Sequence, residues 1–211
     1  MSCRLLMAAL IVVVAAEGSA QQATRSPSPV LPAGGPSLWI FGGMSWPLSR
    51  SGFTEYWQAG PAGAVDFTTN VSRRLSVGIE LDAAAYWFRA EKFVASHPGV
   101  PLRNTPVAMI NIALIGRYEL MKGKRFGPYI GLALGAVRIT EAVYQQIVDS
   151  VRVTYYSIPA KTRLTMACIG GAEYKVSRKF ALDGEARLMY VHHDPDVGLT
   201  LTVRAGVRFT L

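Results

Sequence analysis

The chain has 211 residues and a formal net charge of +8. Its two cysteines, Cys3 and Cys168, cannot form the disulfide framework of a small secreted fold, because Cys3 lies in a segment expected to be removed. A basic chain could suggest a nucleic-acid partner, but 7 of the 22 basic residues cluster at expected turns instead of forming a continuous stripe, so we expect none. These seven residues are Arg73, Arg74, Lys122, Lys124, Arg125, Arg178 and Lys179.

The N-terminus has the order of a secretory signal peptide. Arg4 precedes the apolar run from Leu5 to Ala16, and small residues follow before Gln21, which predicts cleavage after Ala20. The apolar run is shorter than the roughly 20 residues of a membrane-spanning helix. Residues 21–36 are rich in proline, and we expect a disordered leader there. The predicted organisation is a signal peptide over 1–20, this leader over 21–36 and one barrel domain over 37–211.

Apolar and polar residues alternate from Leu38 to the last residue, the pattern of β-strands with two different faces. The segments are close to the 9 to 11 residues with which a tilted strand crosses a bilayer. We therefore predict an all-β fold, an eight-stranded antiparallel up-and-down transmembrane β-barrel. Its expected strands are 38–46, 63–72, 75–85, 110–118, 126–140, 163–176, 180–190 and 199–211. In 126–140 the apolar face continues to Arg138, which predicts a bulge or the membrane rim there.

The connections alternate between short and long. Residues 70–74, 121–125 and 177–178 are expected tight turns, whereas 47–62, 89–106 and 141–160 are long, and only 192–197 breaks the contrast. Transmembrane barrels have short periplasmic turns and long extracellular loops. Within the third long connection, residues 151–155 still alternate, and we expect them to extend a hairpin above the membrane.

Alternation alone would also suit a soluble lipocalin-like barrel with an apolar interior. Aromatic residues near the strand ends favour the membrane, since they are typical of interfacial girdles. The expected girdle residues are Trp39, Trp46, Tyr86, Trp87, Tyr118, Phe126, Tyr129, Tyr174, Phe180, Tyr190 and Phe209.

The C-terminus carries Arg204, Gly206, Phe209 and Leu211. This arrangement resembles the C-terminal assembly signal of bacterial outer-membrane barrels, with Leu211 in place of the usual Phe or Trp. Together with the signal peptide and the eight strands, the chain is similar to the small barrel family that includes the OmpA membrane domain, OmpX and OmpW. The resemblance implies an outer-membrane location, contact with outer-membrane lipid and lipopolysaccharide, assembly by the outer-membrane barrel machinery, and a monomer.

If the apolar face meets lipid, the polar face lies inside the barrel. An eight-stranded barrel is only wide enough to be filled by its own side chains, so we expect the interior charges to pair into a salt-bridged plug. The predicted plug residues are Glu80, Asp82, Arg117, Glu119, Glu173, Lys175, Asp183, Glu185, Arg187, Arg204 and Arg208.

No catalytic, cofactor-binding or metal site is predicted. His192, His193, Asp194 and Asp196 occupy a short loop in which neighbouring side chains diverge, and a solvated loop explains them better than a metal cluster. Loop aromatics could anchor a surface ligand or pack against one another, and the sequence leaves both open. The relevant residues are Phe53, Tyr56, Trp57, Phe93, Tyr144, Tyr155 and Tyr156.

The leading hypothesis is a non-enzymatic barrel with a structural or surface-interaction role through its long extracellular loops. The first alternative is an OmpW-like conduit for small hydrophobic molecules, which would need an apolar lumen or a side opening. The second is a lipid A-modifying barrel enzyme, and the third is the soluble barrel with an apolar ligand cavity.

Overall fold

The computed structural model describes residues 35–48, 57–89, 91–92, 95, 107–121, 124–148, 151–158, 160–192 and 197–211. Within these, only the backbone is described for residues 142–148, 151–158 and 197. The predicted signal peptide and the leader up to residue 34 lie outside the described residues. No helix in the described part of the chain is long and apolar enough to span a membrane.

Eight long strands form one closed sheet. Each pairs antiparallel with its neighbour along the chain, and the pairing of β1 with β11 closes the barrel. The strands are β1 (Ser37–Pro47), β3 (Gly60–Asn70), β4 (Leu75–Phe88), β5 (Val107–Glu119), β6 (Phe126–Ile139), β9 (Lys161–Lys175), β10 (Phe180–His192) and β11 (Val197–Thr210). The predicted eight-stranded antiparallel barrel is confirmed.

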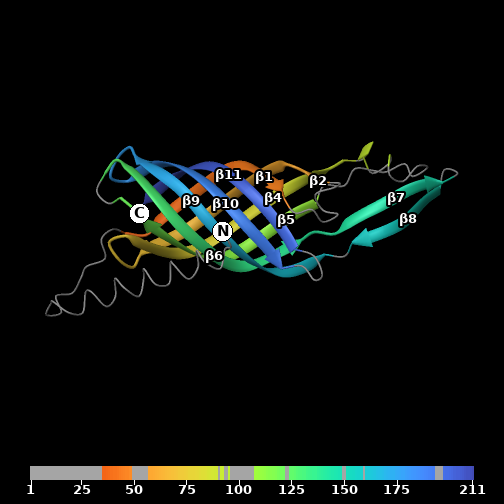
Figure 1. Ribbon diagram of the computed structural model, residues 1–211, viewed down its shortest axis with the longest axis horizontal. Coiled ribbons are helices and arrows are strands. Elements are labelled where there is room, and N and C mark those ends of the chain that lie inside the picture. The colour runs from red at the N-terminus through yellow and green to blue at the C-terminus, as the bar shows by residue number, and fades with distance from the viewer. Residues whose placement is uncertain are drawn as a thin grey trace.

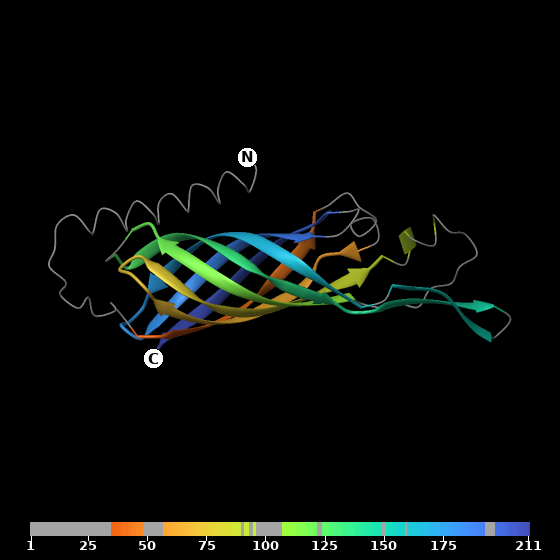
Figure 2. The ribbon, with the colours of Figure 1, turned by 90° about the horizontal axis from the view of Figure 1, so that it is seen from below.

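Three short strands lie beyond the barrel wall. The two-residue β2 (Trp57–Gln58) pairs with the end of β4, whereas β7 (Ala142–Val148) and β8 (Val151–Ile158) pair only with each other. The β7–β8 hairpin continues from β6 and β9 and projects well past the barrel in both views (Figures 1 and 2). Residues 151–155 therefore belong to a hairpin, as their alternation predicted.

The barrel has two unlike ends. We call the end that carries connections 71–74, 120–125 and 176–179 the turn end, and the opposite end, with the long connections, the loop end. The C-terminus lies at the turn end and the β7–β8 hairpin at the loop end (Figure 1). The predicted sorting of short and long connections is therefore confirmed.

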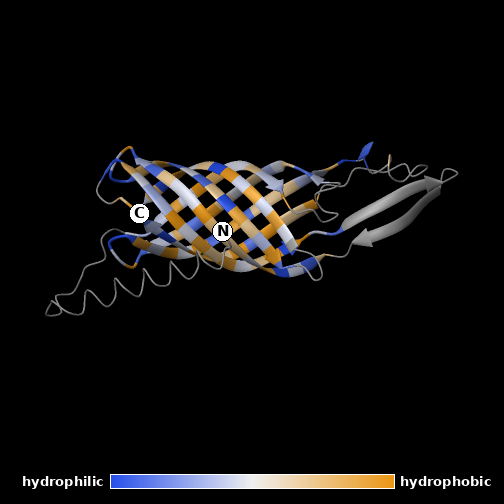
Figure 3. Cartoon of the chain, viewed as in Figure 1, coloured by the Kyte–Doolittle hydropathy of each residue, from blue (hydrophilic) through white to orange (hydrophobic). Residues whose placement is uncertain are grey.

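The outer wall is apolar. Along the strands hydrophobic and hydrophilic residues alternate in a chequered pattern, as Figure 3 shows. Outward side chains are largely exposed, among them Leu114 at 69% and Leu164 at 72%, because period-two alternation in a closed sheet turns every second residue outward. Arg138 shares this outer face near the loop end of β6, in unbroken register with both neighbouring strands. Of the two explanations for Arg138, the structure supports the rim and not a bulge.

The interior has two unlike halves. Charged side chains are concentrated in the half toward the turn end, whereas most of an apolar cluster lies in the half toward the loop end. One member of the cluster, Tyr129, lies in the charged half, where its hydroxyl hydrogen-bonds to Asp183. Of the predicted plug residues, seven are buried, namely Glu80, Arg117, Glu173, Asp183, Glu185, Arg187 and Arg204. The cluster contains Trp57, Ala84, Tyr86, Phe88, Val107, Met109, Ala113, Ile115, Tyr129, Ala133, Val137, Ala167, Ile169, Met189 and Val191.

The predicted girdle residues divide between the barrel interior and the outer wall. Trp39, Tyr86, Tyr118 and Tyr129 are buried, so the prediction that they belong to an exposed girdle is wrong. Their nearness to strand ends does not determine which face they occupy, because position along a strand and side-chain parity are independent. The girdle residues that are exposed on the outer wall are Trp46, Trp87, Phe126, Tyr174 and Phe209.

Candidate functional site

Arg204 lies at the centre of the buried ion-pair network. Its guanidinium is 2.5 Å from Glu80 and 2.6 Å from Glu185, and its Nε donates a second hydrogen bond to Glu185 at 2.8 Å. These three residues come from β11, β4 and β10, so their contacts join strands distant in the chain. All three side chains are almost fully buried. Such charges are stable only when they are well paired and hydrogen-bonded, and these are.

Two further arginines extend this network. Arg187 pairs with Glu80 and lies 2.9 Å from Asp82, while Arg117 lies 2.5 Å from Asp66 and 3.0 Å from Glu185. Glu80 and Glu185 therefore each accept from two guanidinium groups. Sharing partners limits the conformational entropy lost per ion pair, since one fixed side chain serves two interactions.

A second, more exposed group of ion pairs lies at the turn end. Arg208 lies 2.6 Å from Glu173, and Lys175 bridges Glu119 at 2.7 Å and Glu173 at 3.0 Å. The Lys175 side chain is 28% exposed and that of Glu119 is 22% exposed, whereas Arg204 is 2% exposed. Electrostatic interactions weaken toward water, so we expect the central pairs to matter more for stability.

Aromatic residues of β1 complete the network, and the sequence analysis did not assign them this role. The Arg117 guanidinium lies 4.5 Å from the Trp39 ring centre, and that of Arg204 lies 4.4 Å from the Phe41 ring centre. Cation–π contacts of this kind add stabilisation when both partners are desolvated. A sequence argument could have placed these aromatic residues near the arginines by assuming that the barrel closes, because closure pairs β1 with β11 and places Trp39 opposite Arg208.

Asp183 differs from the other interior acids. Its carboxylate accepts a hydrogen bond from the Tyr129 hydroxyl at 2.8 Å, and the same hydroxyl lies 2.9 Å from Glu185. No ion pair joins Asp183 to a cation in the described part of the chain. Asp183, which was expected to pair within the salt-bridged plug, is therefore held by a neutral donor instead.

The described side chains leave little space inside the barrel. A cavity of about 10 Å³ lies beside Ser45, Tyr86 and Arg187, and another of about 50 Å³ opens near Arg117 and Glu173 at the turn end. The smaller space is about that of one water molecule. Together with the apolar cluster, the ion-pair network fills the lumen that these residues line.

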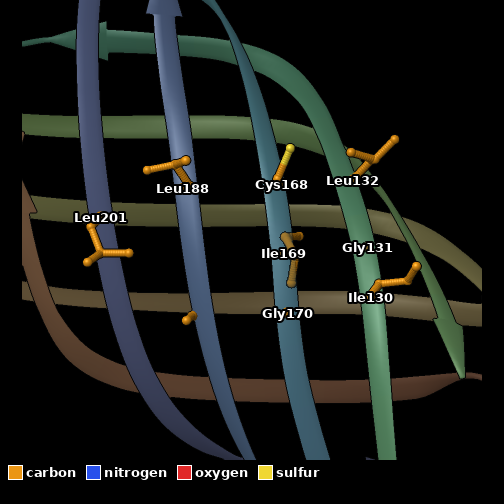
Figure 4. Close-up of a pocket in the computed structure, with 9 residues that line it drawn as sticks. Ile130, Gly131, Leu132, Cys168, Ile169, Gly170, Leu188 and Leu201 are labelled. Carbon is orange, nitrogen blue, oxygen red and sulfur yellow. The ribbon is translucent and has the colours of Figure 1, made fainter. Parts of the chain in front are cut away.

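A larger hollow, of about 230 Å³, lies on the outer wall (Figure 4). It forms over β6, β9 and β10, where Gly170 and Ala186 leave space between longer neighbours such as Leu132 and Leu188. Its lining is predominantly apolar and faces away from the ion-pair network. A surface of this kind suits a hydrocarbon chain.

The four residues of the C-terminal pattern have distinct structural surroundings. Arg204 belongs to the ion-pair network, and a Cβ at Gly206 would come within 2.6 Å of the Phe41 ring. Phe209 packs against Phe180 with ring centres 5.5 Å apart, and Leu211 is exposed. Recognition of these residues by an assembly machinery stays a prediction.

His192 is exposed at the end of β10. The other members of the histidine and aspartate group, His193, Asp194 and Asp196, lie outside the described residues. Among the loop aromatics, only Trp57 has a described side chain, which packs against Phe88 with ring centres 5.0 Å apart. For Trp57, packing between the loop end and the barrel is therefore the better of the two interpretations.

Comparison with known proteins supports the fold. No family model matches the chain, and no curated protein matches it in sequence. Among solved structures it is similar to Neisserial surface protein A, with 14% identity over 83% of this chain and 97% of that one, and a TM-score of 0.55. The protein has the outer-membrane barrel fold. OprG from Pseudomonas aeruginosa matches with 14% identity over 84% and 97%, TM-score 0.51. Ail of Yersinia pestis matches with 12% identity over 83% and 99%, TM-score 0.50.

Proposed function

We propose that this protein spans the outer membrane of a Gram-negative bacterium and serves a non-enzymatic structural or surface-interaction role through its loop end. The observation that carries the proposal is the combination of an apolar outer wall with a lumen filled by charged and apolar side chains. A protein built this way is solvated by lipid on the outside, and its packed side chains oppose passage through its centre.

The outer wall supports the membrane part of the proposal. Outward apolar residues in the middle of strands, such as Ile112 at 58% and Leu114 at 69%, are exposed while Glu80 and Asp66 are fully buried. A water-soluble barrel has the opposite arrangement, because burying charge and exposing large apolar patches both cost free energy in water. The soluble lipocalin-like alternative therefore has no support from the wall.

The loop end supports the interaction part. The β7–β8 hairpin stands clear of the barrel, where a partner outside the cell would meet it first (Figure 2). Long loops on a rigid barrel are where such proteins carry specificity. One similar structure, Ail, is an attachment invasion locus protein solved with a heparin analogue, which makes a polymeric surface ligand a reasonable first class to screen.

The conduit alternative finds one favourable observation, the apolar half of the lumen. That half is packed, however, since Tyr86 and Phe88 are at most 4% exposed and Trp57 lies against Phe88. A conduit would require these side chains to move and the ion-pair network to open. The lipid A-modifying alternative has no observation in its favour among the described residues.

Fractionation of expressing cells, followed by electrophoresis of unboiled and boiled membranes, tests the location. We expect outer-membrane material whose mobility changes on boiling, whereas soluble periplasmic protein would overturn the proposal.

Proteinase K applied to intact cells tests the orientation. We expect cleavage within 142–158 and a protected barrel, and replacement of 142–158 by a short Gly-Asn linker should remove this cleavage while the heat shift remains. Cleavage at the turn end of intact cells would contradict the proposal. Steady conductance in planar bilayers, or rapid uptake of a small apolar fluorophore into protein-containing vesicles, would favour the conduit.

A further inference from the structure

The three connections at the turn end share one composition. Two of them are Val71-Ser72-Arg73-Arg74 and Val176-Ser177-Arg178-Lys179, and the third, 120–125, begins with Leu-Met and ends with Lys-Arg. Each places an apolar residue first and a pair of cations last. None of the three contains an acidic residue. Three of the loop-end connections, 48–56, 89–106 and 140–160, in contrast mix both signs of charge, and the fourth, 193–196, contains only acidic charged residues.

The two serine-containing turns have the same geometry. Ser72 Oγ accepts hydrogen bonds from the N–H groups of Leu75 at 3.1 Å and Arg74 at 3.3 Å. Ser177 Oγ accepts from Phe180 at 3.1 Å and Lys179 at 3.3 Å. The serine thus satisfies the turn backbone, as short hydroxyl side chains often do. The cationic side chains are not needed to close either turn.

Each turn is also tied to the next part of the barrel through its last cation. The carbonyl oxygens of Arg74, Arg125 and Lys179 accept hydrogen bonds from the N–H groups of Glu119 at 2.8 Å, Lys175 at 2.8 Å and Thr210 at 2.9 Å. The backbone beneath the cations is therefore held in place. Six exposed cations of the described turns surround the turn end: Arg73, Arg74, Lys124, Arg125, Arg178 and Lys179.

Apolar side chains lie beside these cations on the outside. Val71, Met121 and Val176 are 56%, 49% and 54% exposed in turns that end in a pair of cations. Phe126 and Tyr174, paired across β6 and β9, are exposed just inside the turn end. Cations next to exposed apolar and aromatic side chains are the composition of surfaces that lie at a lipid headgroup layer.

We propose that the three turns at the turn end bind the anionic phospholipid headgroups of the periplasmic leaflet of the outer membrane. This inference rests on the proposed membrane location and adds a specific lipid partner to it. The cations contact phosphate and glycerol headgroups, while Val71, Met121 and Val176 lie among the first carbons of the acyl chains. The binding sets the depth of the barrel and gives its two ends different lipid preferences.

Spin-labelled lipids measure this preference directly. The mature chain is folded into phosphatidylcholine vesicles, and the association of spin-labelled phosphatidylglycerol is compared with that of spin-labelled phosphatidylcholine. Because each cation near an anionic surface adds to the attraction, we expect the wild-type protein to prefer phosphatidylglycerol by about threefold or more at low salt. The preference should decline toward one in 1 M NaCl, since exposed charges are then screened.

A pair of variants with equal charge change locates the effect. The turn variant R73Q/R74Q/R178Q/K179Q is expected to lose most of the preference. The control variant replaces four exposed loop-end cations, Arg89, Lys92, Arg138 and Lys161, by glutamine and should keep it. Both variants must show the heat-modified mobility of a folded barrel, and the salt dependence of the wild-type protein tests the proposal if either does not.

The outcomes separate this inference from the proposed function. A folded, membrane-inserted wild-type barrel with no preference for phosphatidylglycerol would overturn the lipid proposal alone, and so would equal losses in the turn and control variants. A chain that does not insert into vesicles would overturn both proposals.

Discussion

Replacing Arg204 by methionine should destabilise the barrel strongly. The change removes one cation and leaves Glu80 and Glu185 each with one arginine partner instead of two, at sites where both are buried. Removing one member of a buried, hydrogen-bonded charge pair costs about 3 to 5 kcal/mol. The lost contact with the Phe41 ring adds roughly 2 kcal/mol, because both side chains are buried. We therefore expect the free energy of unfolding to decrease by at least about 3 kcal/mol.

Urea unfolding in phospholipid vesicles, followed by tryptophan fluorescence and by electrophoretic mobility, measures this change. Arg208→Gln is the matched comparison, because Arg208 has one carboxylate partner and an 18% exposed side chain. For this partly exposed pair we expect a decrease of only about 1 kcal/mol. The double variant E80Q/R204M removes a negative charge together with the positive one. Its free energy of unfolding should recover by about 1 kcal/mol relative to R204M.

Three results would refute this reasoning. One is a decrease below about 1 kcal/mol for R204M, which would mean that water solvates the stranded carboxylates. Another is an equal loss for Arg208→Gln. The third is a double variant no more stable than R204M, which would show that packing, and not charge, determines the cost.

Two further predictions concern the two faces of the wall. Gly171→Ala should destabilise the barrel by about 1 to 3 kcal/mol, because its Cβ would lie 2.5 Å from the Tyr129 ring. Gly170→Ala should be nearly neutral, since no atom outside the neighbouring residues lies within 4 Å of that Cβ. Equal effects of the two variants on urea unfolding would contradict this prediction. Leu114→Arg, near the middle of β5, should cost about 2 to 4 kcal/mol in vesicles, and Phe126→Arg, at the turn end, about 1 kcal/mol or less. A mid-strand cost no larger than that at the turn end would argue against the membrane position.

The strands were predictable because their signal is local. Period-two alternation in 199–211 and 180–190 determines which residues share a face, and the structure places Arg204 and Glu185 inside as that parity requires. The alternation of short turns and long loops also predicted which strands are neighbours in the barrel. These features depend on neighbouring residues only, so a single sequence contains them.

The charged residues of the interior could be predicted from the sequence, but their ion-pair partners could not. The sequence indicated which charges lie inside, yet it did not indicate that Arg204 bridges Glu80 and Glu185, or that Asp183 relies on Tyr129. Glu80 and Arg204 are 124 positions apart, and only the register of the closed barrel brings them together. Trp39 and Tyr129 were assigned to the girdle for a different reason, because the prediction used their nearness to strand ends and not the parity that places both on the inner face.

By itself, the sequence determined the fold class, the two faces of each strand and the unlike ends of the barrel. The alternation of side chains and the lengths of the connections encode all three locally. Only the tertiary structure decided that the lumen divides into a charged half and an apolar half, and that the arginines stack on the β1 aromatics. The physical reason is barrel closure, because strands distant in the chain share one narrow interior whose contacts depend on register and shear, not on local pattern.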